Sequence, residues 1–244
     1  MQKYFITKEE LLENKITGDD VFHIKNVMRG RIGDEIIVTD EETELLVKLT
    51  QIEKNYVCFE IEKEIENNNE LKVNVDLYQG YPKGDKLDDI IKYSTQLGIN
   101  KIIPTLMRRS IIKIDPQKVQ NKTIRFNKIA KESAEQSNRK KLSKVLDPIK
   151  LDKIDFSQYD YKIICYEEDA KEGECSNFKK IISNLKPNDS ICVVVGPEGG
   201  IDDTEVEYLK SQGFTSCALG PRILRTETAI LYVLSAVSYE MELK

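Results

Sequence analysis

Two passages in the last third of the chain restrict the fold more than any other feature of the sequence. Each is an apolar run that ends in a glycine-bearing turn and then continues into a helical pattern: residues 193–200, VVVGPEGG, and residues 218–229, ALGPRILRTETA. Strands that alternate with helices in this way are typical of α/β proteins with a parallel sheet. Small ligands bind such sheets in the loops at the carboxyl ends of the strands. We therefore predict that the two loops follow neighbouring strands and form a ligand pocket.

The rest of the chain shows two different patterns. Residues 1–70 contain short alternating segments between turn residues, which favour a small β-barrel, and residues 62–70 have the polar composition of a linker. From residue 73 onward strands and helices alternate, which predicts a mostly parallel sheet covered on both faces. We therefore predict two domains, 1–70 and 73–244. The predicted strands lie at 5–6, 34–39, 44–49, 56–61, 73–78, 101–104, 161–166, 191–195 and 214–219, and the predicted helices at 19–28, 85–97, 115–139, 176–185, 202–211 and 226–241.

Charge is distributed unevenly along the chain, although the net charge is only −5. Residues 1–72 carry a net charge of −7, whereas residues 81–145 carry +10. A basic region of this kind either attracts a polyanion such as RNA or forms solvated helix faces, and composition leaves both interpretations open. The single histidine and five scattered cysteines disfavour a zinc site, so we expect no metal. Because the N-terminus lacks the apolar core of a secretory signal, we expect a cytoplasmic protein.

The two glycine loops differ in the ligand chemistry that they favour. No Lys-Ser/Thr pair follows 196–200, so it is not a phosphate-binding P-loop, and Glu198 would repel a phosphate. A cationic or hydrogen-bond-donating ligand suits it better, and the alternative is a simple tight turn. Arg222 and Arg225 precede a predicted helix, whose N-terminus is already electropositive, so they favour a bound group with negative charge. The alternative is that this segment binds no ligand and that Thr226 or Glu227 only caps the helix.

The sequence contains three further polar clusters besides the two glycine loops. Each of them, taken alone, could also be an ordinary polar surface. They are residues 79–86, QGYPKGDK; residues 104–110, with Arg108, Arg109 and Ser110; and residues 132–139, ESAEQSNR. Together with 196–200 and 219–229, in this order, they closely resemble the RsmE family of the SPOUT superfamily, the 16S ribosomal RNA uracil-N(3) methyltransferases. His23, Val27 and Arg29, followed by Gly33, Asp34 and Glu35, resemble the N-terminal domain of that family.

The resemblance implies a fold and an activity. The expected fold is a PUA-like, RNA-binding β-barrel followed by a SPOUT α/β domain with a C-terminal trefoil knot. The expected activity is methylation of N3 of a specific uridine in the decoding region of 16S rRNA, with S-adenosylmethionine as methyl donor. The family acts as a homodimer. The final predicted helix, with Ile230, Leu231, Val233, Leu234, Val237 and Met241, is apolar enough to supply a dimer interface, or else it is an ordinary core helix.

The resemblance also implies roles for individual residues. Arg225 is the first choice for hydrogen bonds to the uracil oxygens, Arg109, Arg139 and Arg222 are alternatives for base or phosphate contacts, and Glu227 and Glu198 are candidates for the general base. The expected cofactor-binding residues are Gly196, Pro197, Glu198, Gly199, Leu219, Gly220, Ile223, Leu224, Tyr166 and Glu167. The expected RNA-binding residues are His23, Arg29, Lys83, Lys86, Arg108, Gln136, Lys140 and Arg222.

Two other functions compete with this interpretation. A SPOUT methyltransferase that acts on another RNA, such as transfer RNA, would share the same motifs. A non-catalytic RNA-binding assembly protein would use only the barrel and the basic face. The complete set of loop motifs argues against the second of these.

Overall fold

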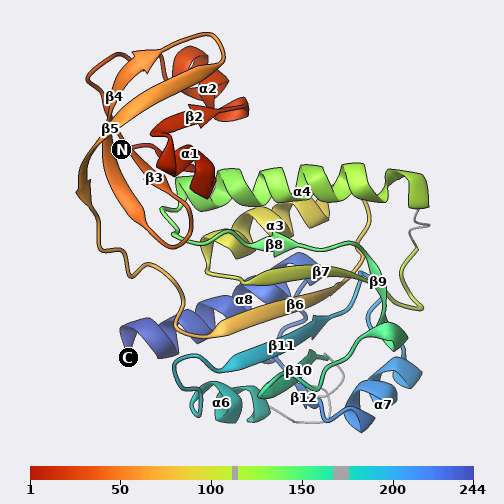
Figure 1. Cartoon of the computed structure of the whole chain (residues 1–244). Helices are drawn as coiled ribbons and strands as arrows, with labels where there is room; N and C mark the ends of the chain where they lie inside the picture. Colours follow the sequence, from red (N-terminus) through yellow and green to blue (C-terminus); the bar gives the residue numbers. More distant parts are fainter. Residues whose placement is uncertain (112–114, 167–175) are drawn as a thin grey trace. The chain divides into compact units, whose positions relative to one another are not determined.

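The structure is a computed structural model that describes residues 1–111, 115–166 and 176–244 (Figure 1). Its contacts divide the chain into two compact units. Unit 1 contains Met1–Glu70 and Ala134–Leu142, and unit 2 contains Leu71–Ser133 and Ser143–Lys244. None of the described helices is both long enough and apolar enough to cross a membrane.

Unit 1 is built on a curled five-stranded sheet in the order β1-β3-β4-β5-β2 (Figure 1). The β1–β3 pair is parallel and the other pairs are antiparallel. Its core holds Ile16, Val38, Val47 and Val57, all fully buried. The elements are β1 (Lys3–Phe5), α1 (Lys8–Leu12), β2 (Lys15–Thr17), α2 (Asp19–Phe22), a π-helix (His23–Val27), β3 (Glu35–Thr39), β4 (Glu44–Ile52) and β5 (Tyr56–Glu64).

Most of these elements confirm the sequence pattern. The four predicted strands of this region are present, and the helix predicted around 19–28 is present as α2 and the π-helix that continues it. The structure adds α1 and β2, which span five and three residues. Elements this short give too few periods for an alternation pattern to identify them.

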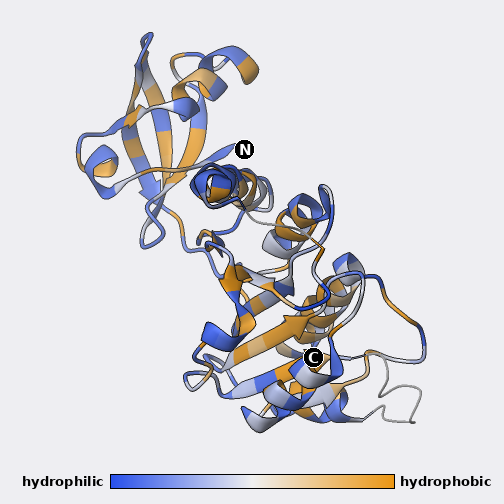
Figure 2. Ribbon diagram, turned by 90° about the vertical axis from the view of Figure 1, so that its right-hand side faces the viewer, coloured by the Kyte–Doolittle hydropathy of each residue, from blue (hydrophilic) through white to orange (hydrophobic). Residues whose placement is uncertain are grey.

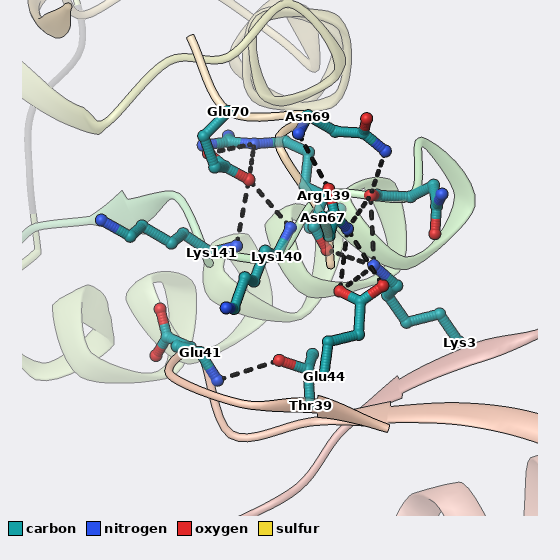
Figure 3. Close-up of polar contacts among 12 residues, drawn as sticks. Lys3, Thr39, Glu41, Glu44, Asn67, Asn69, Glu70, Arg139, Lys140 and Lys141 are labelled. Carbon is teal, nitrogen blue, oxygen red and sulfur yellow. Dashed lines mark hydrogen bonds and ion pairs between the residues drawn. The ribbon is translucent and has the colours of Figure 1, made fainter. Parts of the chain in front are cut away.

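A buried ionic network joins β1 and β4 to the segment that follows the long helix α4 (Pro116–Gln136) (Figure 3). The ammonium group of Lys3 lies 2.7 Å from Glu44 Oε2, and both side chains are only 1% exposed. Lys3 Nζ also donates to the carbonyl oxygens of Asn138 and Arg139, each at 3.1 Å. A buried charge needs this degree of pairing to be stable. The network therefore attaches residues 138–139 to the sheet of unit 1.

Arg139 has a carboxylate partner in the same network. Its side chain is almost fully buried, and Nη2 lies 2.6 Å from Glu70 Oε2. Glu70 also accepts the backbone N–H groups of Lys140 and Lys141, at 2.8 and 3.1 Å. Burial acts to raise the pKa of Glu70, but Arg139 and these N–H groups outweigh it and hold the pKa below its usual value. Because its guanidinium group is held by Glu70, we assign Arg139 to the structure of unit 1 and not to the substrate.

Unit 2 is built on a sheet of seven described strands in the order β12-β10-β11-β6-β7-β8, with β9 paired to β7 (Figure 1). All pairings are parallel, which confirms the predicted sheet. The strands are β6 (Asn74–Gly80), β7 (Lys101–Leu106), β8 (Lys144–Val145), β9 (Ile149–Lys150), β10 (Tyr161–Cys165), β11 (Ser190–Val195) and β12 (Thr215–Cys217). The helices are α3 (Lys86–Gln96), α4, a short 3-10 helix (Leu151–Lys153), α6 (Asn177–Ile182), α7 (Asp203–Ser211), α8 (Thr226–Ser238) and a terminal π-helix (Tyr239–Leu243).

Both faces of this sheet are covered by apolar contacts, as the pattern predicted. Leu77 and Val193 belong to a core shared with α3, α4, α6 and α8, whereas Tyr78 and Val194 belong to a second core shared with α7 and residues 151–159. Figure 2 shows the hydrophobic colouring concentrated in these strands. Successive residues of a strand point to opposite faces, so one apolar run supplies both cores.

The predicted adjacency of the two glycine loops is wrong. The loops follow β11 and β12, and β10 lies between these strands. Spatial order in a parallel sheet depends on how the crossover connections run, and the local pattern of each strand does not contain that information. The trefoil knot implied by the resemblance stays a prediction.

The last helix is mainly a core helix. Ile230, Val233, Leu234 and Val237 are fully buried within unit 2, so these residues are not available for a dimer interface. The apolar side chains that α8 and the π-helix after it leave exposed are Tyr232, Tyr239 and Leu243.

Candidate active site

Four loops of unit 2 open at one edge of the sheet. The residues that pair across the sheet near this edge are Cys217, Cys165, Val195, Gln79 and Pro104, on β12, β10, β11, β6 and β7. All these strands are parallel, so the segments that follow β6, β7, β11 and β12 meet at their carboxyl ends. The chain order reverses between β6 and β11, and ligands of open α/β sheets bind at such a switch point.

A short chain of hydrogen bonds joins three of these segments. The Thr226 hydroxyl, at the start of α8, donates to the Gly196 carbonyl at 2.6 Å. The side-chain amide of Gln79, at the end of β6, donates to the Thr226 hydroxyl at 2.8 Å. Gln79 and Thr226 are buried, so both bonds lie out of solvent. The end of β6, the loop after β11 and the start of α8 therefore form one connected structure.

The backbone of β6 also packs directly on the loop after β11. A Cβ atom on Gly80 would lie 2.4 Å from Pro197 Cδ and 2.5 Å from Pro197 N. No side chain fits at that distance, so only glycine allows this approach. Gly196 is similarly enclosed, because its Cβ would lie 2.8 Å from Ile201 Cγ1. Gly80 and Gly196 thus serve close backbone packing.

Lys86 lies between the two acidic residues of the glycine loops. Its ammonium group is 3.0 Å from Glu198 Oε1 and 3.7 Å from Glu227 Oε2. The backbone N–H of Lys83 also donates to Glu198 Oε1, at 3.0 Å. Burial acts to raise the pKa of Glu198, but hydrogen bonds from its own N–H, from Lys86 and from Lys83 outweigh it and hold the pKa below its usual value. Glu198 is therefore a stable anion and a weak base, and we assign Lys86 to holding the loops together.

Replacing Lys86 by methionine should weaken binding of the expected cofactor, S-adenosylmethionine, by about fivefold, because the segments after β11 and β12 lose the bridge that fixes their positions. An exposed ion pair is worth up to about 1 kcal/mol. Isothermal titration calorimetry measures this affinity. Lys92→Met is the matched control, since Lys92 is an exposed lysine of the same helix. Equal affinities for the two variants would contradict the bridging role.

Two arginines after β7 contact the loop that follows β11. Arg109 Nη1 donates to the Gly199 carbonyl at 3.3 Å, and Arg109 Nη2 lies 3.6 Å from Asp202 Oδ2. Arg108 Nη1 lies 3.9 Å from Asp202 Oδ1, and the Arg108 N–H donates to Glu205 Oε1 at 2.8 Å. Asp202 also caps α7, the helix predicted at 202–211, and its side chain accepts the backbone N–H of Thr204. The structure thus brings Arg109 together with loop 196–200.

Arg225 occupies the N-cap position of α8 and extends into solvent. Its side chain is 83% exposed, and Nη1 lies 4.0 Å from Glu227 Oε1. Arg222 and Ile223 of the same loop are also exposed. Gly220 has φ +106°, and a Cβ atom there would have no neighbour within 4 Å. The loop after β12 therefore borders open space and carries two available cations.

The other predicted site residues fall into three groups. Tyr166 follows β10, and its hydroxyl donates to Asp203 Oδ1 at 3.1 Å. Glu167 lies outside the described residues. The predicted site residues that lie in unit 1 are His23, Arg29, Gln136, Arg139 and Lys140. Nδ1 of His23 lies 2.9 Å from the Tyr4 hydroxyl. Arg29 and Gln136 are exposed, and Lys140 is partly buried.

Gln79 is the site residue whose role the sequence did not reveal. It is fully buried, and its Oε1 has no hydrogen-bond partner among the described residues. A buried acceptor without a donor is unfavourable unless a ligand or water satisfies it. One sequence feature could have identified Gln79 as a site residue, namely an amide side chain near the end of a buried strand.

Comparison with known proteins decides the family. The family model for an RNA methyltransferase domain matches residues 69–238, and the family model for an RNA methyltransferase PUA domain matches residues 16–62. Ribosomal RNA small subunit methyltransferase E of Bacillus subtilis is 44% identical over 252 residues, which cover 100% of this chain and 98% of the relative. The chain belongs to the ribosomal RNA small subunit methyltransferase E family. The resemblance to the RsmE family is thereby confirmed.

Other members of the ribosomal RNA small subunit methyltransferase E family support the same conclusion. The Aquifex aeolicus enzyme is 30% identical, over 88% of this chain and 90% of its own length. The crystal structure of the Neisseria gonorrhoeae family member bound to S-adenosyl methionine aligns with a TM-score of 0.82 and 28% identity, covering 98% of this chain and 97% of that one. The α/β fold with an N-terminal PUA-like domain is therefore confirmed for the whole chain.

Proposed function

We propose that this protein transfers a methyl group from S-adenosylmethionine to N3 of one uridine in the decoding region of 16S rRNA. The observation that carries the proposal is the convergence of four loops at one sheet edge, where loop 196–200, which packs closely on the end of β6, and the loop after β12 border Arg109, Arg225 and Glu227. The Bacillus subtilis relative is named as a methyltransferase of small-subunit ribosomal RNA. The Neisseria gonorrhoeae relative was crystallised with S-adenosyl methionine.

The residues present suit S-adenosylmethionine, which supplies an electrophilic methyl group on a sulfonium when bound. The ionised Glu198 carboxylate favours a cationic ligand. The unsatisfied Oε1 of Gln79 would accept a hydrogen bond, and the space beside Gly220 is free of side chains. We propose that the cofactor is held by the backbone and apolar groups of both glycine loops, with Tyr166 and Glu167 after β10. The loop residues are Gly196, Pro197, Glu198, Gly199, Leu219, Gly220, Ile223 and Leu224.

We assign the main catalytic role to Arg225. Negative charge develops on the uracil oxygens as the N3 proton leaves, and a guanidinium donor to these oxygens strengthens as that charge grows. Arg225 has no carboxylate closer than Glu227 at 4.0 Å, so it is available for this contact. Arg109 and Arg222 are the alternatives. Arg139 is excluded from this assignment by its partner Glu70.

Glu227 is the better candidate for the base that accepts the N3 proton. Its Oε2 has no hydrogen-bond donor among the described residues, and it forms an ion pair with the ammonium group of Lys86 at 3.7 Å. Glu198 is engaged by three donors, and these hold its pKa low, which makes it the weaker base.

RNA binding is proposed for residues of both units. They are His23, Arg29, Gln136 and Lys140 in unit 1, and Lys83, Arg108 and Arg222 in unit 2. Contacts of this kind to phosphate groups contribute affinity that falls with salt. Ribosomal RNA as the substrate also implies that the protein acts in the cytoplasm.

Transfer of a labelled methyl group from S-adenosylmethionine to purified RNA tests the activity. We expect incorporation into 16S rRNA or assembled small subunits prepared from cells that lack the gene, and none into transfer RNA. Preferential labelling of transfer RNA would favour the alternative substrate. Binding of RNA without labelling of any RNA would favour the assembly protein.

We also propose a homodimer formed through the exposed apolar side chains of the C-terminal helix region, Tyr232, Tyr239 and Leu243. Tyr239 is 60% exposed, which is unfavourable for an unpartnered ring next to other apolar groups. Light scattering at micromolar concentration should give twice the chain mass, and Tyr239→Glu should shift the protein toward the monomer. A monomeric mass for the unmodified chain would contradict the dimer.

A further inference from the structure

One buried threonine separates the two proposed catalytic groups of α8. Thr226 is the first residue of the helix, between Arg225 at the N-cap position and Glu227 in the first turn. The side chain of Thr226 is buried, whereas that of Arg225 is 83% exposed. Adjacent Cα atoms lie about 3.8 Å apart, so a contact that fixes Thr226 also fixes the backbone that carries its two neighbours.

The hydroxyl of Thr226 makes two hydrogen bonds, and its partners determine their directions. It accepts from the Gln79 side-chain amide at 2.8 Å and lies 2.6 Å from the Gly196 carbonyl oxygen. A carbonyl oxygen can only accept and a hydroxyl has a single hydrogen, so that hydrogen points to Gly196. The Thr226 hydroxyl therefore attaches the first residue of α8 to the first residue of loop 196–200.

The orientation of the Gln79 amide is fixed as well. Besides contacting Thr226, its Nε2 lies 3.0 Å from the Gly80 carbonyl oxygen and 3.4 Å from that of Gly196. Turning the amide over would place Oε1 against these two acceptors, which is unfavourable. All four residues are buried, and a buried network whose donors are matched to acceptors is rigid. Gln79 therefore holds the Thr226 hydroxyl in one direction.

We infer that Thr226 is a positioning residue, which sets the distance between the methyl donor held by loop 196–200 and the groups of Arg225 and Glu227. The inference rests on the proposed function, which places the donor and these groups at this edge of the sheet. Gly196 and Thr226 are 30 positions apart in the chain, so their separation depends on contacts between the two segments. Reacting atoms must approach to about 3–3.5 Å, and a misplacement of about 1 Å can cost about a hundredfold in rate.

Replacing Thr226 by valine removes the hydroxyl and keeps the branched shape. With RNA and cofactor both saturating, we expect the single-turnover rate of methyl transfer to fall by about thirtyfold. The affinity for S-adenosylmethionine, measured by calorimetry without RNA, should fall by about fivefold, because loop 196–200 loses a buried hydrogen bond. Thr226→Ser keeps the hydroxyl and should restore both quantities to within about threefold of the unmodified protein.

Thr105→Val is the matched control for the loss of a hydroxyl from a buried threonine. Thr105 is a fully buried residue of β7, and its hydroxyl donates to the Ile103 carbonyl of the same strand at 3.0 Å. This variant should lower the melting temperature about as much as Thr226→Val does, and it should leave the rate and the cofactor affinity within about twofold. A general loss of stability would affect both variants alike.

Two results would overturn the inference: equal rates and affinities for Thr226→Val and Thr226→Ser, or equal rates and affinities for Thr226→Val and Thr105→Val. If Thr226→Val fails to fold, Thr226→Ala replaces it, because alanine and serine at this position differ only by the hydroxyl oxygen. An unmodified protein that methylates no RNA would reject the proposed reaction. The calorimetric comparison would still test the attachment of the loop, since it needs no RNA, and equal affinities of the serine and valine variants would reject it.

Discussion

Replacing Arg225 by alanine should lower the single-turnover rate of methyl transfer by about a hundredfold or more with RNA and cofactor both saturating. The reason is that the guanidinium group gains interaction energy only as charge develops on the uracil oxygens, so its loss affects the transition state more than either bound ground state. The affinity for S-adenosylmethionine should stay within about twofold, because the backbone of the loop after β12 is unchanged.

Arg222→Ala is the matched control for Arg225→Ala. Arg222 is an exposed arginine of the same loop, three residues earlier. Its loss should weaken RNA binding and reduce the salt dependence of that binding, with little change of rate at saturation. A parent-like rate for Arg225→Ala with saturating RNA would make Arg225 a docking residue and transfer the catalytic assignment to Arg109.

Replacing Gly220 by leucine should reduce the affinity for S-adenosylmethionine by at least about a hundredfold. A Cβ at this position would have no atom of a non-neighbouring residue within 4 Å, and we propose that the cofactor occupies this space. A leucine side chain would fill the same space. Calorimetric titration of the folded variant measures the loss.

Backbone strain is the competing explanation for this loss, because Gly220 has φ +106°, which L side chains rarely adopt. Gly213→Leu carries comparable strain at φ +85°, after α7 and outside the four loops. It should leave the cofactor affinity within about twofold. If both variants lose affinity equally, strain explains the effect and the cofactor lies elsewhere.

The elements that the sequence predicted best are those with strong local signals. The strand predicted at 191–195 is β11, and the helices predicted at 85–97 and 202–211 are α3 and α7. Asp202 caps α7, and Gly98 and Gly213 follow the two helices with positive φ. Each of these features is decided by the side chain's own chemistry and by its immediate neighbours. The parallel sheet was predicted from the alternation of strands and helices, and each of these elements has its own local pattern.

Features that depend on residues far apart in the chain were not predictable in this way. Glu70 and Arg139 are 69 positions apart, and no local pattern marks them as partners. The resemblance to the RsmE family implied an RNA contact for Lys86, and the structure places its ammonium group beside two carboxylates. Its two carboxylate partners come from loops more than 100 residues later, after β11 and β12. The position of β10 between β11 and β12 likewise depends on residues far apart in the chain.

Mapping of methylated nucleotides tests the central claim most directly. 16S rRNA from cells that lack the gene is incubated, free or in small subunits, with the protein and S-adenosylmethionine, and the modified nucleoside is identified by mass spectrometry. We predict that N3-methyluridine forms at a single position in the decoding region, and that Arg225→Ala forms it far more slowly. Methylation of another base, or of another atom of uracil, would contradict the proposed function.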